Sequence, residues 1–188
     1  MADSCPSCGT DLLANAKFCH SCGSPIQASG DRAEYKQVTV LFTDVVRSMA
    51  IASAVDVERL REIMAELFTR SAAVVQRYGG TVDKFTGDGI MALFGAPIAL
   101  EDHAVRACRA ALEIQDAARE LAREVERTDG VDLEIRVGLN SGRVIAGEIA
   151  SGAAGYTAVG EQVGLAQRME SVAPAGGVML MRVDRASR

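Results

Sequence analysis

Two aspartates stand where the chain can present bare carboxylates to a metal ion. Asp88 lies between two glycines (TGDG) that separate two apolar, β-prone runs, 81–86 and 90–94. Glycine reaches positive φ without a Cβ penalty, so the pattern predicts a tight hairpin with Asp88 at its tip. Asp44 ends another strand-like run, 37–43. Carboxylates at strand ends suit a hard cation such as Mg²⁺, although aspartate as a turn former also explains Gly-Asp-Gly by itself.

Four cysteines near the N-terminus have the spacing of a second metal site. Two CxxC pairs, Cys5/Cys8 and Cys19/Cys22, are separated by ten residues. Thiolates with this spacing converge tetrahedrally on zinc, which predicts one structural Zn²⁺. Disulfides are the alternative, but nothing in the sequence indicates secretion. His20 lies inside the second pair and is interpreted as a bystander, because four thiolates already complete the site. This region resembles a zinc ribbon.

These features predict three segments along the chain. Residues 1–26 form the ribbon, 27–35 a linker that contains Ser29-Gly30-Asp31, and 36–188 the main domain. The ribbon carries very few basic residues, which favours a structural or docking role with an unspecified partner over DNA binding.

Composition excludes several classes of protein. The 188 residues are 48% hydrophobic, enough for one ordinary core and a small appended module. A net charge of −5 argues against a general nucleic-acid binder. The longest apolar stretch, Ile90–Leu100, contains Gly95 and Pro97 and is too short to span a bilayer. Without a signal-peptide pattern, the sequence predicts a cytoplasmic protein without a membrane segment.

Hydrophobic periodicity predicts the remaining elements. Amphipathic helices are expected over Val55–Tyr78, Glu101–Arg127 and Gly160–Val172. Strands are expected over Val131–Leu139, Arg143–Ile149, Tyr156–Val159 and Gly177–Met181, with Asn140-Ser141-Gly142 as the turn between the first two. The order β-α-β-β-α-β-β-α-β predicts an α+β fold with helices on one face of a mainly antiparallel sheet.

Two side chains of the 101–127 helix carry reactive groups without a predicted role. Cys108 is expected to be a small core side chain. His103 is interpreted as a surface residue in the first turn.

Three motifs then occur in a fixed order: FTDVVRS, DKFTGDG and YTAVGEQVGLAQRME. Together they closely resemble the catalytic domain of class III nucleotidyl cyclases, the adenylate and guanylate cyclases, from Lys36 to about Leu180. Small bacterial cyclases with an N-terminal zinc ribbon are similar to the whole chain. The resemblance implies a ferredoxin-like palm, which the element order indicates independently.

The resemblance also implies a two-metal reaction. Asp44 and Asp88, assisted by a backbone carbonyl near Val45, are expected to bind two Mg²⁺ or Mn²⁺ ions. Two such ions lower the pKa of a ribose 3′-hydroxyl and shield the triphosphate as pyrophosphate leaves. Arg168 matches the arginine that stabilises charge on the transferring phosphate, a task that suits the fixed fork of a guanidinium.

Two positions of the family motif read the base. Lys84 falls where a lysine implies adenine, because it donates to the purine N1, whereas guanylate cyclases usually carry glutamate there. Thr157 falls at the second position, and its hydroxyl can accept from the adenine amino group or donate to a guanine carbonyl. ATP is therefore the expected substrate, with GTP left open.

The chain departs from the family pattern in two places. In VNxxxR the asparagine orients the ribose, and Gly164 stands there in this sequence. Loss of one such oriented hydrogen bond costs roughly 10²–10³ in rate. The family's final helix and hairpin, with a lysine for the triphosphate, are expected beyond Arg188, so the domain resembles a C-terminally truncated cyclase.

The distance along the substrate predicts an assembly. An extended ATP places its base roughly 10 Å or more from its phosphates, more than neighbouring side chains on one hairpin cover comfortably. The resemblance implies a head-to-tail homodimer in which Asp44 and Asp88 come from one chain. Lys84, Thr157 and Arg168 then come from the other, which yields two equivalent sites.

Two functions remain open from the sequence. The first is an adenylate cyclase that converts ATP to 3′,5′-cyclic AMP and pyrophosphate, slowed by Gly164 and the missing end. The second is a catalytically weak or inactive module that acts in nucleotide binding or dimerisation. A diguanylate cyclase would need a GG[DE]EF turn, which TGDGI does not match.

Overall fold

The computed structural model describes residues 4–5, 7–13, 16, 18–24, 33–148 and 156–181. The chain divides into two compact units, 1–32 and 33–188. Most of the expected linker, residues 149–155 and the chain end at 182–188 lie outside the described residues. None of the helices within the described ranges is long and apolar enough to cross a membrane.

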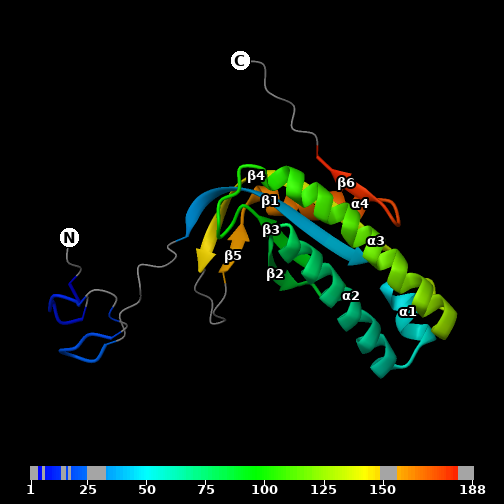
Figure 1. Ribbon diagram of the computed structural model, residues 1–188, viewed down its shortest axis with the longest axis horizontal. Helices are drawn as coiled ribbons and strands as arrows, with labels where there is room; N and C mark the ends of the chain where they lie inside the picture. Colours follow the sequence, from blue (N-terminus) through cyan, green and yellow to red (C-terminus); the bar gives the residue numbers. More distant parts are fainter. Residues whose placement is uncertain are drawn as a thin grey trace, which may run out of the picture. The chain divides into compact units, whose positions relative to one another are not determined.

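The larger unit is built on a six-stranded sheet (Figure 1). Its strands are β1 (Glu34–Val45), β2 (Thr81–Phe85), β3 (Ile90–Phe94), β4 (Ile135–Glu148), β5 (Tyr156–Val159) and β6 (Val178–Leu180). Along the sheet the order is β2-β3-β1-β4-β5, and β6 pairs with β4. All pairings are antiparallel except that of β6 with β4. The predicted α+β class and mainly antiparallel sheet are confirmed.

The helices are α1 (Ser48–Ala54), α2 (Val57–Arg77), α3 (His103–Asp129) and α4 (Glu161–Val172). The three predicted helices exist within a few residues of their expected bounds, whereas α1 was not predicted. Asp56 caps α2 by accepting a hydrogen bond from the backbone nitrogen of Arg59 at 2.8 Å. Helix α3 ends at Gly130, whose φ of 69° is a left-handed C-cap conformation.

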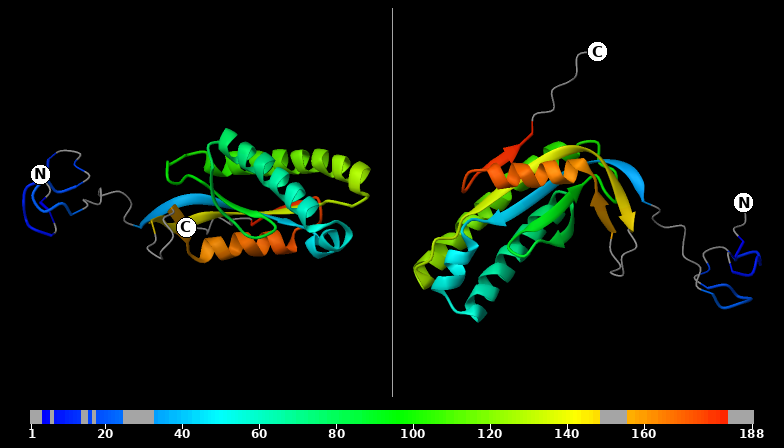
Figure 2. Two further views of the ribbon diagram at one scale, coloured as in Figure 1. Left: turned by 90° about the horizontal axis from the view of Figure 1, so that it is seen from below. Right: turned by 180° about the vertical axis from the view of Figure 1, so that it is seen from behind.

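Helices cover both faces of the sheet, so the expectation of helices on one face is wrong. Figure 2 shows α4, in orange, on the opposite side of the sheet from α2 and α3. Two buried apolar clusters fill the two layers: Leu41 and Val45 of β1 belong to one, and Val38, Val40 and Phe42 to the other, together with Ala166 of α4. A central strand that is apolar on both faces requires cover on both, and that signal was present in the run 37–43.

The predicted turn at Asn140-Ser141-Gly142 is also wrong, because β4 runs through it without a break. Val40, Thr39 and Val38 of the long strand β1 pair with these three residues in register. Asn140 is buried, and its side-chain amide donates to Gln162 Oε1 of α4 at 2.7 Å rather than to a turn. A Cβ at Gly142 would lie 2.7 Å from the Gln162 side chain. The residues of the expected turn therefore accommodate the packing of α4. The antiparallel partner that follows β4 is β5, not the predicted strand 143–149.

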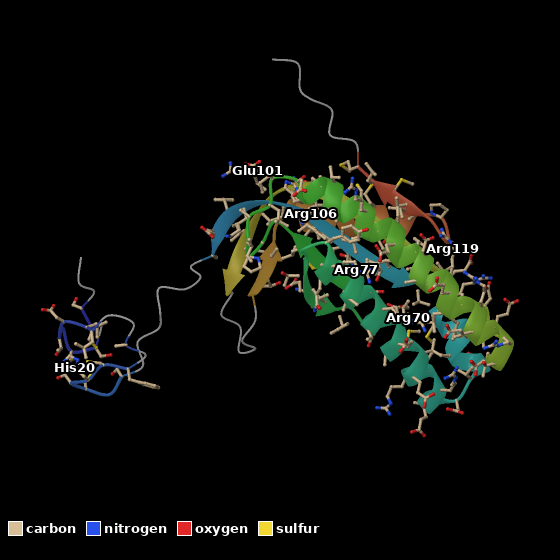
Figure 3. All side chains as sticks on the ribbon, in the orientation of Figure 1. His20, Arg70, Arg77, Glu101, Arg106 and Arg119 are labelled. Carbon is tan, nitrogen blue, oxygen red and sulfur yellow. The ribbon has the colours of Figure 1, made fainter. Side chains whose placement is uncertain are left out.

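Arg70 and Arg77, which Figure 3 labels, form ion pairs that join the two long helices α2 and α3. Arg70 of α2 pairs with Glu124 of α3 at 3.1 Å, and Arg77 pairs with Glu113. Cys108 was expected to be a core side chain; it is half-buried and packs against the edge of the core cluster. His103 is not simply a surface residue, because it is half-buried and its Nδ1 lies 2.7 Å from Thr39 Oγ1. Burial lowers the pKa of His103.

Candidate active site

The β2–β3 hairpin lies against the end of β1 and brings the two predicted metal aspartates together. A Cβ at Gly89 would lie 1.8 Å from the carbonyl oxygen of Thr43, so only glycine permits this approach. The backbone nitrogen of Val45 donates to the carbonyl oxygen of Asp88 at 3.2 Å, which fixes the tip of the hairpin. Asp88 is half-buried rather than fully open, and Ser48 Oγ at the start of α1 donates to its carboxylate at 2.8 Å.

The two carboxylates influence each other electrostatically. Burial raises the pKa of Asp44, the Arg136 guanidinium works against that shift, and the neighbouring carboxylate of Asp88 adds to it. Two acids that repel each other in a half-buried position offer oxygen ligands to a divalent cation, whose charge relieves the repulsion. Asp44 and Asp88 therefore fit a site for Mg²⁺ or Mn²⁺. Val45 supplies backbone to the same corner, and its side chain is buried in the core.

Arg136 and Glu170 belong to this corner, and the sequence did not single out either of them. Arg136 of β4 pairs in register with Asp44 of β1 and donates to its carboxylate from Nη2 at 2.7 Å and from Nε at 3.1 Å. Glu170 of α4 lies 2.6 Å from Arg136 Nε, as an ion pair. Arg136 lies in a strand of alternating charged and apolar residues, and only the strand register shows which acid it faces.

The two predicted base-reading residues converge from different strands. Lys84 of β2 donates from Nζ to Oγ1 of Thr157 of β5 at 3.1 Å. A third residue, Asp83, joins them: Thr157 Oγ1 donates to Asp83 Oδ2 at 2.8 Å, and Lys84 Nζ lies 3.3 Å from the same oxygen. Asp83 was not among the predicted site residues, because its place beside Lys84 in the sequence does not reveal its contact with β5.

Helix α4 carries the remaining predicted residues on its exposed surface. Arg168 is exposed, and no hydrogen bond or ion pair of its guanidinium occurs with any residue that the structure describes. Gly164 is exposed one turn earlier, and open space surrounds the position of an added Cβ. In the described part of the chain, neither Arg168 nor the pair Lys84 and Thr157 is linked by a hydrogen bond or ion pair to Asp44 or Asp88.

The four N-terminal cysteines form one cluster in the smaller unit. Their sulfur atoms all lie within 4.8 Å of one another, with Cys5 and Cys22 at 3.7 Å and Cys8 and Cys19 at 3.6 Å. A tetrahedral Zn²⁺ with Zn–S bonds of about 2.3 Å has sulfur–sulfur edges of about 3.8 Å, so the cluster fits zinc. His20 is exposed and outside the cluster.

Hydrogen bonds tune two of these thiols. The Thr10 hydroxyl lowers the pKa of Cys8 to about 6, and the Ser24 hydroxyl lowers that of Cys22. Both shifts favour the thiolate, which is the form that binds a metal. The pKa of Cys5 is instead raised to about 11, because a backbone hydrogen bond that lowers it is outweighed by burial and the neighbouring thiols.

Two family models match the chain. The model of the adenylate and guanylate cyclase catalytic domain matches residues 31–184, and a zinc-ribbon domain model matches residues 4–26. The first match covers well over half of the chain.

Similar proteins include cyclases of both kinds. Adenylate cyclase 1 of Rhizobium meliloti (strain 1021) is 32% identical over 146 residues, which cover 76% of this chain and 22% of that protein. The chain thus spans only about a fifth of that relative. The crystal structure of the guanylyl cyclase Cya2 has a TM-score of 0.75 and 34% identity, and covers 79% of this chain and 76% of that chain. The adenylyl cyclase CyaB from P. aeruginosa has a TM-score of 0.74 and 30% identity, with coverage of 79% and 78%.

The predicted cyclase fold and the predicted zinc ribbon are therefore confirmed by both the matches and the observed architecture. The substrate remains open, because the similar proteins include both adenylate and guanylate cyclases. This chain belongs to the class III adenylate and guanylate cyclase family and carries an N-terminal zinc-ribbon domain.

Proposed function

We propose that this protein is an adenylate cyclase that converts ATP to 3′,5′-cyclic AMP and pyrophosphate in a head-to-tail homodimer. In this reaction the ribose 3′-oxygen forms a bond to the α-phosphorus and loses its proton. The bond between the α-phosphorus and the bridging oxygen to the β-phosphate breaks, and pyrophosphate leaves with that oxygen. Such a transfer depends mainly on positioning and on stabilisation of charge.

The corner around Asp44 and Asp88 supports the chemical step. Two Mg²⁺ or Mn²⁺ ions, when bound there, lower the pKa of the 3′-hydroxyl and shield the triphosphate. Ser48 orients the Asp88 carboxylate through its 2.8 Å hydrogen bond. Arg136 donates to the Asp44 carboxylate at 2.7 Å and holds it at this corner.

Arg168 is assigned to the transition state. Its guanidinium is exposed and has no partner in the described part of the chain, so a ligand does not compete with an existing ion pair. A free guanidinium offers donors in a fixed fork, which suits the equatorial oxygens of a phosphate in transfer.

The observation that carries the choice of ATP is the convergence of Lys84 and Thr157. The Lys84 ammonium only donates hydrogen bonds, and adenine offers an acceptor at N1, whereas guanine carries a proton there. Thr157 Oγ1 lies 3.1 Å from Lys84 Nζ. When Lys84 donates to N1 of adenine, the neighbouring 6-amino group needs an acceptor, and Thr157 Oγ1 can supply it. The pair therefore matches the adenine edge better than the guanine edge.

A second candidate function is a nucleotide-binding or dimerisation module with little turnover. The observation that favours it is Gly164, which lies exposed on α4 and offers no side chain to the ribose. The module would keep the metal and base contacts and lack the alignment of the 3′-hydroxyl.

Assay of the purified chain with ATP and GTP, each with Mg²⁺ and with Mn²⁺, separates these functions. We expect cyclic AMP as the main product, and a loss of at least about 10²-fold in rate in Asp44→Ala and Asp88→Ala. Asp116→Ala removes an exposed aspartate on α3 and is the matched control.

Three results would contradict the proposal or part of it. Nucleotide binding without any cyclic product would favour the non-catalytic module. Unchanged turnover in Asp88→Ala would exclude the assigned metal site. Cyclic GMP as the main product would contradict the choice of ATP while leaving the cyclase assignment intact.

A further inference from the structure

Asp83 occupies an irregular position in the sheet. Between β2 and β3, Val82 pairs with Ala92 and Lys84 pairs with Met91, so Asp83 is an extra residue opposite the β3 strand. Such a β-bulge inserts one extra residue into a strand and so changes the direction of a side chain relative to the regular alternation between the two faces of the sheet. Here it allows two successive residues, Asp83 and Lys84, to form hydrogen bonds with the same atom, Oγ1 of Thr157 on β5.

The carboxylate of Asp83 is buried, and it has two partners. Its side chain is only 1% exposed. Oδ2 accepts the hydroxyl proton of Thr157 at 2.8 Å and lies 3.3 Å from Lys84 Nζ. A buried carboxylate is costly unless it is paired and hydrogen-bonded. The contacts with Thr157 and Lys84 are therefore strongly favoured over conformations that break them.

We infer that Asp83 is a specificity-determining residue that fixes Thr157 as a hydrogen-bond acceptor and so selects adenine. A threonine hydroxyl has one proton to donate and two lone pairs. Asp83, as a carboxylate, only accepts, so it holds that single proton. Thr157 Oγ1 then presents lone pairs alone to a ligand, one of which accepts from Lys84 in the free chain.

The fixed polarity distinguishes the two purines. Adenine presents an acceptor at N1 and an amino donor at position 6, which match the Lys84 donor and the Thr157 acceptor. Guanine presents a proton at N1 and a carbonyl oxygen at position 6. Its N1–H donor would face the Lys84 donor, and its carbonyl acceptor would face the Thr157 acceptor, so neither pair forms a hydrogen bond. An unpaired polar group in a binding site is a strong source of discrimination. The inference rests on the proposed cyclase function and deepens it, because Asp83 itself does not contact the base.

The test compares the ratio of kcat/KM for ATP to that for GTP between the wild type and Asp83→Asn. The asparagine amide can donate to Thr157 as well as accept from it, so the threonine proton becomes free for a guanine carbonyl. We expect the ATP:GTP ratio to fall by roughly tenfold. A general loosening of the site would lower both rates together and leave the ratio unchanged.

Thr157→Val provides the second half of a double-mutant cycle. Because Asp83 acts through the hydroxyl, Asp83→Asn should change the ratio much less in the Thr157→Val background than in the wild type. Thr157→Ser keeps the hydroxyl and should keep the ratio. Asp116→Asn is the matched acid-to-amide control on the exposed face of α3. Asp83→Ala replaces Asp83→Asn if thermal melting shows that the amide variant does not fold.

Competition of ATP and GTP against a fluorescent ATP analogue gives a readout that does not need turnover. A wild type that prefers ATP, combined with an unchanged ratio in Asp83→Asn, overturns the inference and leaves the proposed function standing. A wild type that prefers GTP overturns the inference as well. A wild type that binds and cyclises neither nucleotide overturns the proposed function, and the inference with it.

Discussion

Gly164 provides no side chain at the position of α4 where the family motif has an asparagine that orients the ribose. The position is exposed, and an added Cβ would meet no atom within 4 Å. Glycine also weakens a helix interior by roughly 0.5–1 kcal/mol relative to alanine. A side chain can therefore be restored here without a steric cost, which makes the position a direct test of how far one missing amide limits turnover.

We predict that Gly164→Asn raises kcat for ATP by at least about tenfold and up to on the order of 10²-fold, because a positioned hydrogen bond returns to the ribose. Gly164→Ala is the control, since it removes the flexible glycine without adding a donor. It should stabilise α4 by up to about 1 kcal/mol in thermal unfolding and leave kcat unchanged. An equal gain in both variants would assign the effect to helix stability rather than to the ribose contact.

Residue types and motif order were sufficient to identify most of the candidate site, but not its electrostatic partners. Asp44, Asp88, Lys84 and Thr157 each stand in a motif with a recognisable residue pattern. Arg136 and Asp83 do not, because their roles depend on pairs that are distant in sequence. Arg136 faces Asp44 through the β1–β4 register, and Asp83 reaches Thr157 through a bulge. A one-residue change of register would abolish either contact, and no local propensity specifies it.

At the scale of elements, β4 shows how tertiary context overrides local turn chemistry. Asn-Ser-Gly is a turn-forming sequence, yet β1 is long enough to pair with 12 consecutive residues of β4, from Ile135 to Ala146. Continuing the ladder satisfies the backbone groups that a turn would leave to solvent. The small residues at 140–142 then serve the packing of α4, whose Gln162 fills the space beside Gly142. The strands and helices with strong hydrophobic periodicity were predicted well, because in them the sequence pattern and the tertiary packing favour the same structure.

The two cysteine pairs form an element whose stability depends on a metal. We predict one Zn²⁺ per chain in metal-replete protein, measured by elemental analysis, because the four sulfurs already have the spacing of a tetrahedron. Cys8→Ser should reduce the content to well below one. Cys108→Ser is the control: this fifth cysteine lies on α3, packs against the core of the larger unit and should leave the zinc content unchanged. Full zinc content in Cys8→Ser would reject the assigned ligand set.

At the scale of the whole molecule, the residues assigned to one reaction fall into separate groups within a single chain. Asp88 accepts a hydrogen bond from Ser48 at the start of α1, whereas Lys84, only four residues earlier, donates to Thr157 on β5. Arg168 lies exposed on α4 and has no hydrogen bond or ion pair with either group among the described residues. ATP needs all of these groups at once, since its base and its phosphates are joined. A twofold assembly solves this problem, because the metal corner of one chain can face the base-reading pair and Arg168 of another.

We therefore predict that two inactive variants restore activity when they are combined. Asp44→Ala removes the metal corner, and Arg168→Ala removes the guanidinium, so each homodimer carries a lesion in both of its sites. In the mixed dimer, one site receives both lesions and the other receives neither. Random mixing of equal amounts makes half of the dimers mixed, and each has one of two sites intact, so cyclic AMP formation should return to about one quarter of the wild-type rate. Mixing Asp44→Ala with Asp88→Ala is the control and should give no recovery, because both lesions lie in the same corner and every site then lacks one metal ligand. If mixed dimers form, as shown by co-purification of two tags, and the first mixture stays inactive, each site is built from one chain and the head-to-tail arrangement is wrong.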